Sequence, residues 1–192
     1  MKVFLSGGTG FIGTPLTKAL VGRGWQVTVL TRSGTSPDPA LPPSGVAGVK
    51  GDVTDKESMR AAMSGADVVI HNAGWYELGI STSAKTQMMA INVQGTANVL
   101  SLATELKIPR IVYTSTCNAF GDTQGETVDE SFTRVSPIIT HYEQTKTEAH
   151  EIARKYQSQG APVIIVCPAV VIGPGDHSAF GYFARLYVRH LL

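Results

Sequence analysis

The fold is decided by one stretch, Lys2-Val3-Phe4-Leu5-Ser6-Gly7-Gly8-Thr9-Gly10-Phe11-Ile12-Gly13, in a chain of 192 residues. A short apolar run ends there in glycines, and apolar residues at helical spacing follow. Glycines at 7, 10 and 13 permit a tight turn, a close approach of the backbone to a ligand, and close packing of helix on strand. N–H groups at the start of that helix would face an anion. The stretch predicts an anion-binding turn, although an ordinary glycine-rich turn has the same spacing.

Apolar runs alternate with helical patterns along the rest of the chain. We predict strands over 26–31, 46–50, 66–71, 110–115 and 162–167, and helices over 14–24, 55–63, 82–106, 141–157 and 180–192. Residues 33–45 and 117–140 are predicted to be loops, the second a candidate functional segment because of its length. This alternation predicts an α/β fold, a doubly wound parallel sheet with helices on both faces.

Polar and glycine-rich clusters follow the predicted strands at their carboxyl ends. They are the glycine turn, residues 31–32, Asp52, residues 72–74, residues 115–116 and residues 168–176. Sheets of this kind bind ligands at that edge. The clusters therefore predict one shared binding site.

The composition limits the class of partner. The chain is 43% apolar and 16% charged, with a formal net charge of +1. Such a balance offers no basic field for nucleic acid or anionic membrane and favours a small-molecule substrate. Cys117 and Cys167 lack the spacing of a metal site, and we expect them to be reduced thiols in apolar surroundings of a cytoplasmic protein. No export signal or membrane span is expected.

Tyr142 and Lys146 are four residues apart on a predicted helix and should share one face. A nearby ammonium favours the phenolate form of a tyrosine, so such a pair suits acid–base chemistry. The polar cluster Thr114-Ser115-Thr116 ends the preceding predicted strand and could hold a substrate oxygen.

With the glycine turn, this hydroxyl cluster and Tyr-x-x-x-Lys in order, residues 1–176 resemble the extended short-chain dehydrogenase/reductase superfamily, in its epimerase/dehydratase and dihydroflavonol-reductase-like branch. The resemblance implies a Rossmann-type fold and an NAD(P)-dependent oxidoreductase acting on a secondary alcohol or carbonyl. A nucleotide-sugar epimerase or dehydratase with retained NAD is the alternative. A nucleotide-sensing module without turnover is a second alternative.

The resemblance also implies roles for individual residues. Thr116 takes the position of the family's catalytic hydroxyl, with Ser115 as the alternative. Tyr142 would exchange a proton with the substrate oxygen. Lys146 would lower the pKa of Tyr142 and hold the nicotinamide ribose. The Asn92 backbone carbonyl would organise a water of the proton relay. The implied cofactor contacts are Gly7, Thr9, Gly10, Phe11, Ile12 and Gly13 at the pyrophosphate, Asp52 and Val53 at adenine, and Ala73, Gly74, Tyr142, Lys146 and Pro168 toward the nicotinamide.

Cofactor choice depends on the end of the second predicted strand, Thr31-Arg32-Ser33. An acidic residue there would hold the ribose hydroxyls of NAD. Arg32 instead supplies a guanidinium suited to a phosphate, so NADP is preferred over NAD.

The resemblance divides the chain in two. Residues 1–176 are expected to form a dinucleotide-binding domain with the catalytic residues, and residues 177–192 the start of a truncated C-terminal substrate region. The long helix and the catalytic helix form the usual dimer bundle of the superfamily, which makes a homodimer possible.

Overall fold

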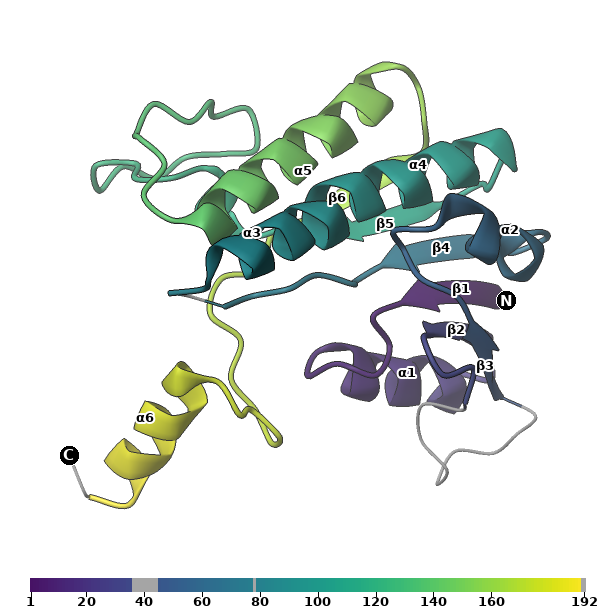
Figure 1. The fold of residues 1–192 in the computed structure, drawn as a ribbon, viewed down its shortest axis with the longest axis horizontal. Helices are drawn as coiled ribbons and strands as arrows, with labels where there is room; N and C mark the ends of the chain where they lie inside the picture. The colour runs from purple at the N-terminus through teal and green to yellow at the C-terminus, as the bar shows by residue number, and fades with distance from the viewer. Residues whose placement is uncertain (36–44, 78, 191–192) are drawn as a thin grey trace.

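The computed structural model describes residues 1–35, 45–77 and 79–190. Its centre is a six-stranded parallel sheet in the order β3-β2-β1-β4-β5-β6 (Figure 1). The strands are β1 (Lys2–Ser6), β2 (Gln26–Thr31), β3 (Val46–Lys50), β4 (Val68–His71), β5 (Ile111–Thr114) and β6 (Val163–Val166). The chain leaves β1 toward β3 and returns to build β4 to β6 on its other side, so the switch point lies between β1 and β4. The predicted doubly wound α/β fold is confirmed.

Helices cover both faces of the sheet, as Figure 1 shows. The helical elements are α1 (Gly13–Gly22), α2 (Lys56–Met63), α3 (Thr82–Met89), η1 (Ala90–Gln94), α4 (Gly95–Glu105), η2 (Cys117–Ala119), α5 (His141–Ser158) and α6 (Ala179–Val188). Alternate residues of β1 serve opposite faces: Phe4 packs in the cluster with α2, α4 and α5, whereas Val3 and Leu5 pack in the cluster with α1. Both clusters are buried, which explains the continuous apolar runs of the strands.

Element ends differ from the prediction by a few residues. The strand predicted over 66–71 begins at Val68, and the helix predicted over 180–192 ends at Val188. Within the predicted loop over 33–45, residues 36–44 lie outside the described residues, as do 191–192 of the last helix.

The predicted helix over 82–106 is a continuous helical segment, but its middle turn, η1, is a π-helix. The Thr96 hydroxyl donates to the Asn92 carbonyl at 2.6 Å and so satisfies an acceptor of this wider turn. Single π turns are frequent at functional sites. The turn therefore marks Asn92 as a residue of interest.

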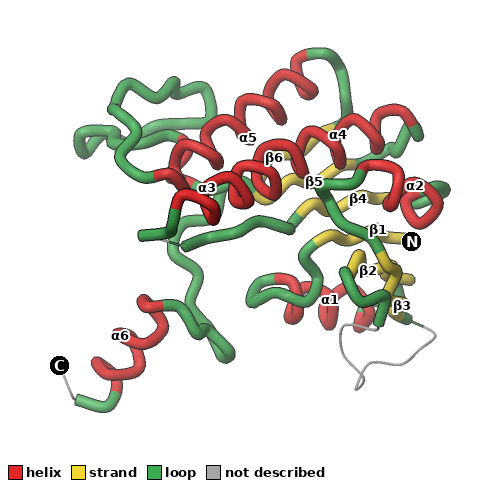
Figure 2. The backbone as a smooth tube through the Cα atoms, in the orientation of Figure 1, coloured by secondary structure: helices red, strands yellow, loops and turns green. Residues whose placement is uncertain are grey.

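Two helices differ in how they are anchored. Thr140 and Glu143 form a capping box at the start of α5, which fixes where this helix begins. In contrast, α6 stands apart from the sheet in Figure 2, and its Phe180, Phe183 and Tyr187 are exposed. In the part of the chain that the structure describes, no helix has the length and apolar character needed to cross a membrane.

Candidate active site

The glycine turn joins β1 to α1 at the switch point, and two of its glycines have no room for a side chain. Gly7 has φ +76°, and a Cβ there would lie 2.5 Å from the Ala73 nitrogen. A Cβ at Gly13 would overlap the Gly7 carbonyl oxygen. Thr9, Gly10 and Ile12 are exposed at the rim. The absent side chains let the turn close tightly at the start of α1, as a glycine cradle for a pyrophosphate requires.

The segment that follows β6 lies against this turn. A Cβ at Gly173 would be in van der Waals contact with the Phe11 ring, at 3.8 Å. The Pro168 carbonyl accepts from the Cys117 N–H at 3.1 Å, which ties the same segment to the residue after Thr116. The fold thus brings Phe11, Pro168 and Thr116 to one edge.

The two positions expected near the adenosine differ from one another. Asp52 is partly exposed, and its carboxylate accepts from the Thr54 N–H at 2.9 Å. Val53 is 7% exposed and belongs to the core cluster. Its side chain packs toward Gly95, where a Cβ would lie 2.8 Å from Val53 Cγ2. Arg32 is exposed directly after β2. The chain turns there, and the Gly34 N–H donates to Thr31 Oγ1 at 2.9 Å across the turn.

Asn92 clamps the backbone that follows β4. Its Oδ1 accepts from the Trp75 N–H at 2.8 Å, and its Nδ2 donates to the Trp75 carbonyl at 3.0 Å. The same Nδ2 donates to Thr145 Oγ1 of α5 at 3.0 Å. The side chain is 2% exposed and joins three elements. The sequence predicted a role for its backbone carbonyl, which the structure pairs with Thr96, and missed this clamp.

The two candidate hydroxyls after β5 have different partners. Ser115 Oγ lies 2.9 Å from His150 Nδ1, and both residues are buried. Thr116 Oγ1 accepts from the Asn118 N–H at 3.2 Å, and its proximity lowers the pKa of Tyr142. The structure therefore places Thr116 beside the candidate tyrosine and directs Ser115 inward.

The surroundings of Tyr142 favour the protonated form of its phenol. Burial raises the pKa of its phenol above the ordinary value, and the Thr116 hydroxyl only partly opposes this effect. The Tyr76 ring packs on Tyr142 in an edge-to-face arrangement, with centroids 4.7 Å apart.

Lys146 is 6% exposed, and its ammonium is hydrogen-bonded to two residues of β5. Nζ donates to the Thr114 carbonyl at 3.0 Å and to the Tyr113 hydroxyl at 3.2 Å. Burial lowers the pKa of Lys146 to about 8. Burial is the largest influence on the pKa of Tyr142 in this structure, and the Lys146 ammonium bonds to β5, so the expected lowering of that pKa by Lys146 stays a prediction.

Gly74 lies next to this lysine. A Cβ at Gly74 would be 3.9 Å from Lys146 Nζ and 3.6 Å from Asn92 Oδ1. Ala73 and Gly74 therefore border both the glycine turn and the lysine, as expected for residues along the nicotinamide side of a cofactor.

The cysteines differ from expectation. Cys117 is exposed and Cys167 is half-buried. The expectation of apolar surroundings is therefore wrong for Cys117, which lies where the chain leaves the end of β5. Among residues 1–35, 45–77 and 79–190, no group of three or more His, Cys, Asp or Glu side chains is arranged to hold a metal ion.

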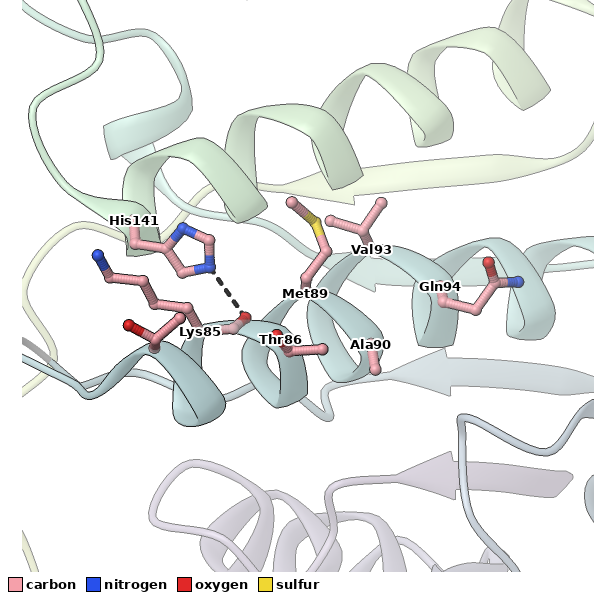
Figure 3. Close-up of a pocket in the computed structure, with 8 residues that line it drawn as sticks. Lys85, Thr86, Met89, Ala90, Val93, Gln94 and His141 are labelled. Carbon is pink, nitrogen blue, oxygen red and sulfur yellow. Dashed lines mark hydrogen bonds between the residues drawn. The ribbon is translucent and has the colours of Figure 1, made fainter.

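A hollow of about 520 Å³ lies on the outer side of α3 and η1, away from the residues above (Figure 3). His141 closes one end, with Nε2 3.0 Å from the Lys85 carbonyl. The other residues that line it are Thr82, Thr86, Met89, Ala90, Val93 and Gln94. None of these lining residues belongs to the candidate site, although His141 precedes Tyr142 and Val93 follows Asn92 in the chain.

Sequence reasoning missed several polar residues beneath the site, namely Tyr113, Thr96, Thr145 and His150. For His150 a signal was present, because Tyr142, Lys146 and His150 follow one another at four-residue spacing on α5. His71 at the end of β4 is fully buried between Ser6 and Thr96.

Comparison with known proteins agrees with this geometry. The family model for the NAD dependent epimerase/dehydratase family matches residues 3–189. A Synechocystis sp. protein provisionally named dihydroflavonol 4-reductase is 35% identical over 175 residues, covering 90% of this chain and 50% of its own length. The 2-alkyl-3-oxoalkanoate reductase of Stenotrophomonas maltophilia is 32% identical over 180 residues, covering 92% of this chain and 52% of its own.

A solved structure shares the fold. The dTDP-glucose 4,6-dehydratase DesIV of Streptomyces venezuelae, with NAD and TYD bound, aligns with a TM-score of 0.79 at 23% identity, over 99% of this chain and 63% of its own. The chain spans about half the length of the curated relatives it matches. Because the family model covers nearly all of the chain and the glycine cradle, Thr116, Tyr142 and Lys146 meet at one edge of the sheet, the chain belongs to the NAD-dependent epimerase/dehydratase family.

Proposed function

We propose that the protein is an NAD(P)-dependent oxidoreductase that interconverts a secondary alcohol and a carbonyl. The observation that carries the proposal is the meeting of Thr116, Tyr142 and the buried Lys146 at the edge of the sheet that also holds the glycine cradle. When bound, a nicotinamide dinucleotide supplies the hydride donor or acceptor.

The residues present fit such a cofactor. The turn from Gly7 to Gly13 would hold its pyrophosphate, because the missing side chains at its two ends let the turn pack closely against Ala73 and on itself at the start of α1. Lys146 would hold the nicotinamide ribose, since its Nζ lies near Gly74 at the open side of the site. Asp52, Ala73 and Pro168 would border the rest of the cofactor.

The chain itself would contribute the proton of the Tyr142 phenol to the reaction. A phenol with a raised pKa is protonated at neutral pH, so Tyr142 is ready to donate to a carbonyl oxygen, which favours reduction. Thr116 would donate a hydrogen bond to the same oxygen, whereas Ser115 would support the site from within through His150.

NADP is the proposed cofactor over NAD. Arg32 is exposed directly after β2, and residues 31–33 contain no carboxylate. A guanidinium there would bind a 2′-phosphate, whereas a carboxylate would repel it.

The reductase is preferred to a nucleotide-sugar epimerase or dehydratase because the two curated relatives above, at 35% and 32% identity, carry reductase names. The likeness to a dehydratase at 23% identity supports the fold alone. NAD that stays bound through purification would favour the epimerase or dehydratase, and no activity on a broad carbonyl panel would favour a sensing module.

The experiment is Tyr142→Phe in the full-length protein, with Tyr156→Phe as a matched loss of one hydroxyl from the same helix, at a residue that packs against the core. We expect Tyr142→Phe to lose at least about a hundredfold in kcat, the usual contribution of a general acid, while the dissociation constant for NADPH changes little. Tyr156→Phe should keep the activity. Full activity in Tyr142→Phe would refute the assignment.

Three further proposals concern the whole protein. Residues 1–176 form the dinucleotide-binding domain, and residues 177–192 begin a C-terminal substrate region, consistent with the exposed aromatic side chains of α6. A homodimer would form through the outer side of α3 and α5, where the hollow of Figure 3 lies, and sedimentation would test it. The place of action is the cytoplasm, with a small-molecule substrate.

A further inference from the structure

Tyr113 is fully buried on β5, yet it carries a hydroxyl where the core would accept a phenylalanine. Its ring packs in the same cluster as Phe4 and Ala149. A buried phenol needs a hydrogen-bond partner, because an unpaired hydroxyl in the core is costly. The Tyr113 oxygen accepts from the Lys146 ammonium at 3.2 Å, and the Thr96 and Ser115 hydroxyls are close enough to lower the pKa of the phenol.

The same ring also supports the charge itself. Lys146 Nζ lies 5.0 Å from the centroid of the Tyr113 ring, within the range of a cation–π contact. The hydroxyl and ring together face an ammonium that is withdrawn from water. Of the three ammonium protons, the Thr114 carbonyl and the Tyr113 hydroxyl accept two, and Gly74 borders the same nitrogen.

His71 holds the Tyr113 ring from the other side. The two rings stack with centroids 5.6 Å apart and planes 22° apart. The Thr96 hydroxyl donates its proton to the Asn92 carbonyl, so the Thr96 oxygen accepts from His71 Nε2 at 3.0 Å. The other ring nitrogen, Nδ1, then accepts from the Ser6 hydroxyl at 2.7 Å. This arrangement matches a neutral imidazole, which adds no charge beside the ammonium.

We propose that Tyr113 is a positioning residue for Lys146: its hydroxyl accepts a hydrogen bond from the ammonium and holds it, charged, at the level of Gly74. The proposal rests on the proposed function for the purpose of that charge, which is to hold a cofactor ribose. Tyr113 contacts Lys146 through both its hydroxyl and its ring, so it would act through Lys146.

Several titratable groups surround the ammonium. They are His71 on β4, Tyr113 on β5, Tyr142 and His150 on α5, and Cys167 after β6. Burial lowers the pKa of His71 to about 3 and raises that of Tyr113, so both are neutral where Lys146 titrates. Burial also lowers the pKa of His150 and raises those of Tyr142 and Cys167. Among these titratable groups, Tyr113 is the one that accepts a hydrogen bond from the ammonium within the described residues.

The test is Tyr113→Phe, which keeps the ring and removes the oxygen, with Tyr156→Phe as the control. Lysine labelled with ¹³C at Cε reports the titration of Lys146 in an NMR pH series, and Lys146→Met identifies its signal. Losing an acceptor favours the neutral amine, so the midpoint in Tyr113→Phe should fall by about half a unit or more below that of the unchanged chain. Tyr156→Phe should leave it unchanged. A Lys146 midpoint that is the same in all three proteins would overturn the proposal.

A second measurement needs no substitution, in case Tyr113→Phe does not fold. With ¹³C at tyrosine Cζ, the Tyr113 signal of the unchanged chain should move with a midpoint equal to that of Lys146. A Tyr113 signal that stays constant through that range would contradict the hydrogen bond. Neither measurement uses turnover, so a failure of the proposed oxidoreductase activity would leave both results interpretable.

Discussion

The Tyr76 ring stands edge-on to the Tyr142 ring, with centroids 4.7 Å apart and ring planes at 81°. Tyr76 is 58% exposed, whereas Tyr142 is partly buried beneath it. An exposed aromatic residue therefore shields the candidate proton donor from water. The backbone of the preceding residue, Trp75, is held by Asn92, which fixes where this shield begins.

Replacing Tyr76 should change the titration of Tyr142. In Tyr76→Ala, the Tyr142 phenol gains water, the phenolate is better solvated, and the pKa of Tyr142 should fall toward its ordinary value. Tyr76→Phe keeps the shielding ring and should remain closer to the unchanged chain. Tyrosine Cζ NMR over a pH series measures both. An equal pKa in Tyr76→Ala and the unchanged chain would show that Tyr76 contributes no shielding.

The glycines at the two ends of α1 should respond in opposite directions to alanine. In Gly13→Ala the new methyl overlaps the Gly7 carbonyl, so we expect a loss of about 3 kcal/mol in the free energy of unfolding. A Cβ at Gly22, the last residue of α1, has no atom within 4 Å, so Gly22→Ala should gain about 0.5 kcal/mol. Urea denaturation compares them, and equal stabilities would contradict the crowding at Gly13.

Arg32→Asp should reverse the proposed cofactor preference. The substitution removes a phosphate partner and introduces a carboxylate, so the ratio of dissociation constants for NADPH and NADH should rise by about tenfold or more, equivalent to 1.4 kcal/mol. Arg23→Asp makes the same charge change at the end of α1 that leads into β2, and should leave the ratio unaltered. Fluorescence titration of both variants decides, and a ratio unmoved by Arg32→Asp would remove the support for NADP.

Asn92→Ala should release the segment after β4. The Trp75 N–H then loses its acceptor, and its hydrogen exchange should become faster, with a loss of about 2 kcal/mol in stability for the buried groups left unpaired. Asn92→Asp retains an oxygen for that N–H but loses the donors to the Trp75 carbonyl and Thr145. Trp75 exchange should therefore stay slower in Asn92→Asp than in Asn92→Ala. Unchanged exchange in both variants would mean that the clamp is not needed.

Much of the fold could be predicted because its signals are local. Strand and helix periods, the Gly24 turn after α1 and the Thr140–Glu143 capping box depend on residues close in sequence. The π turn at Asn92 could not, because it depends on Thr96, Trp75 and Thr145 together. Exposure of Cys117 likewise depends on where the chain leaves the sheet.

Local sequence patterns were enough to predict the strand–turn–helix around Gly7 and Gly13, the order of the elements, and the shared face of Tyr142 and Lys146. These follow from steric limits and repeats that act within a few residues. The folded chain was needed to show that Ser115 turns to His150, that Thr116 lies beside Tyr142, and that the Lys146 ammonium bonds to Tyr113 and Thr114. Burial and hydrogen-bond partners are set by groups far apart along the chain, and these decide which proton each side chain keeps.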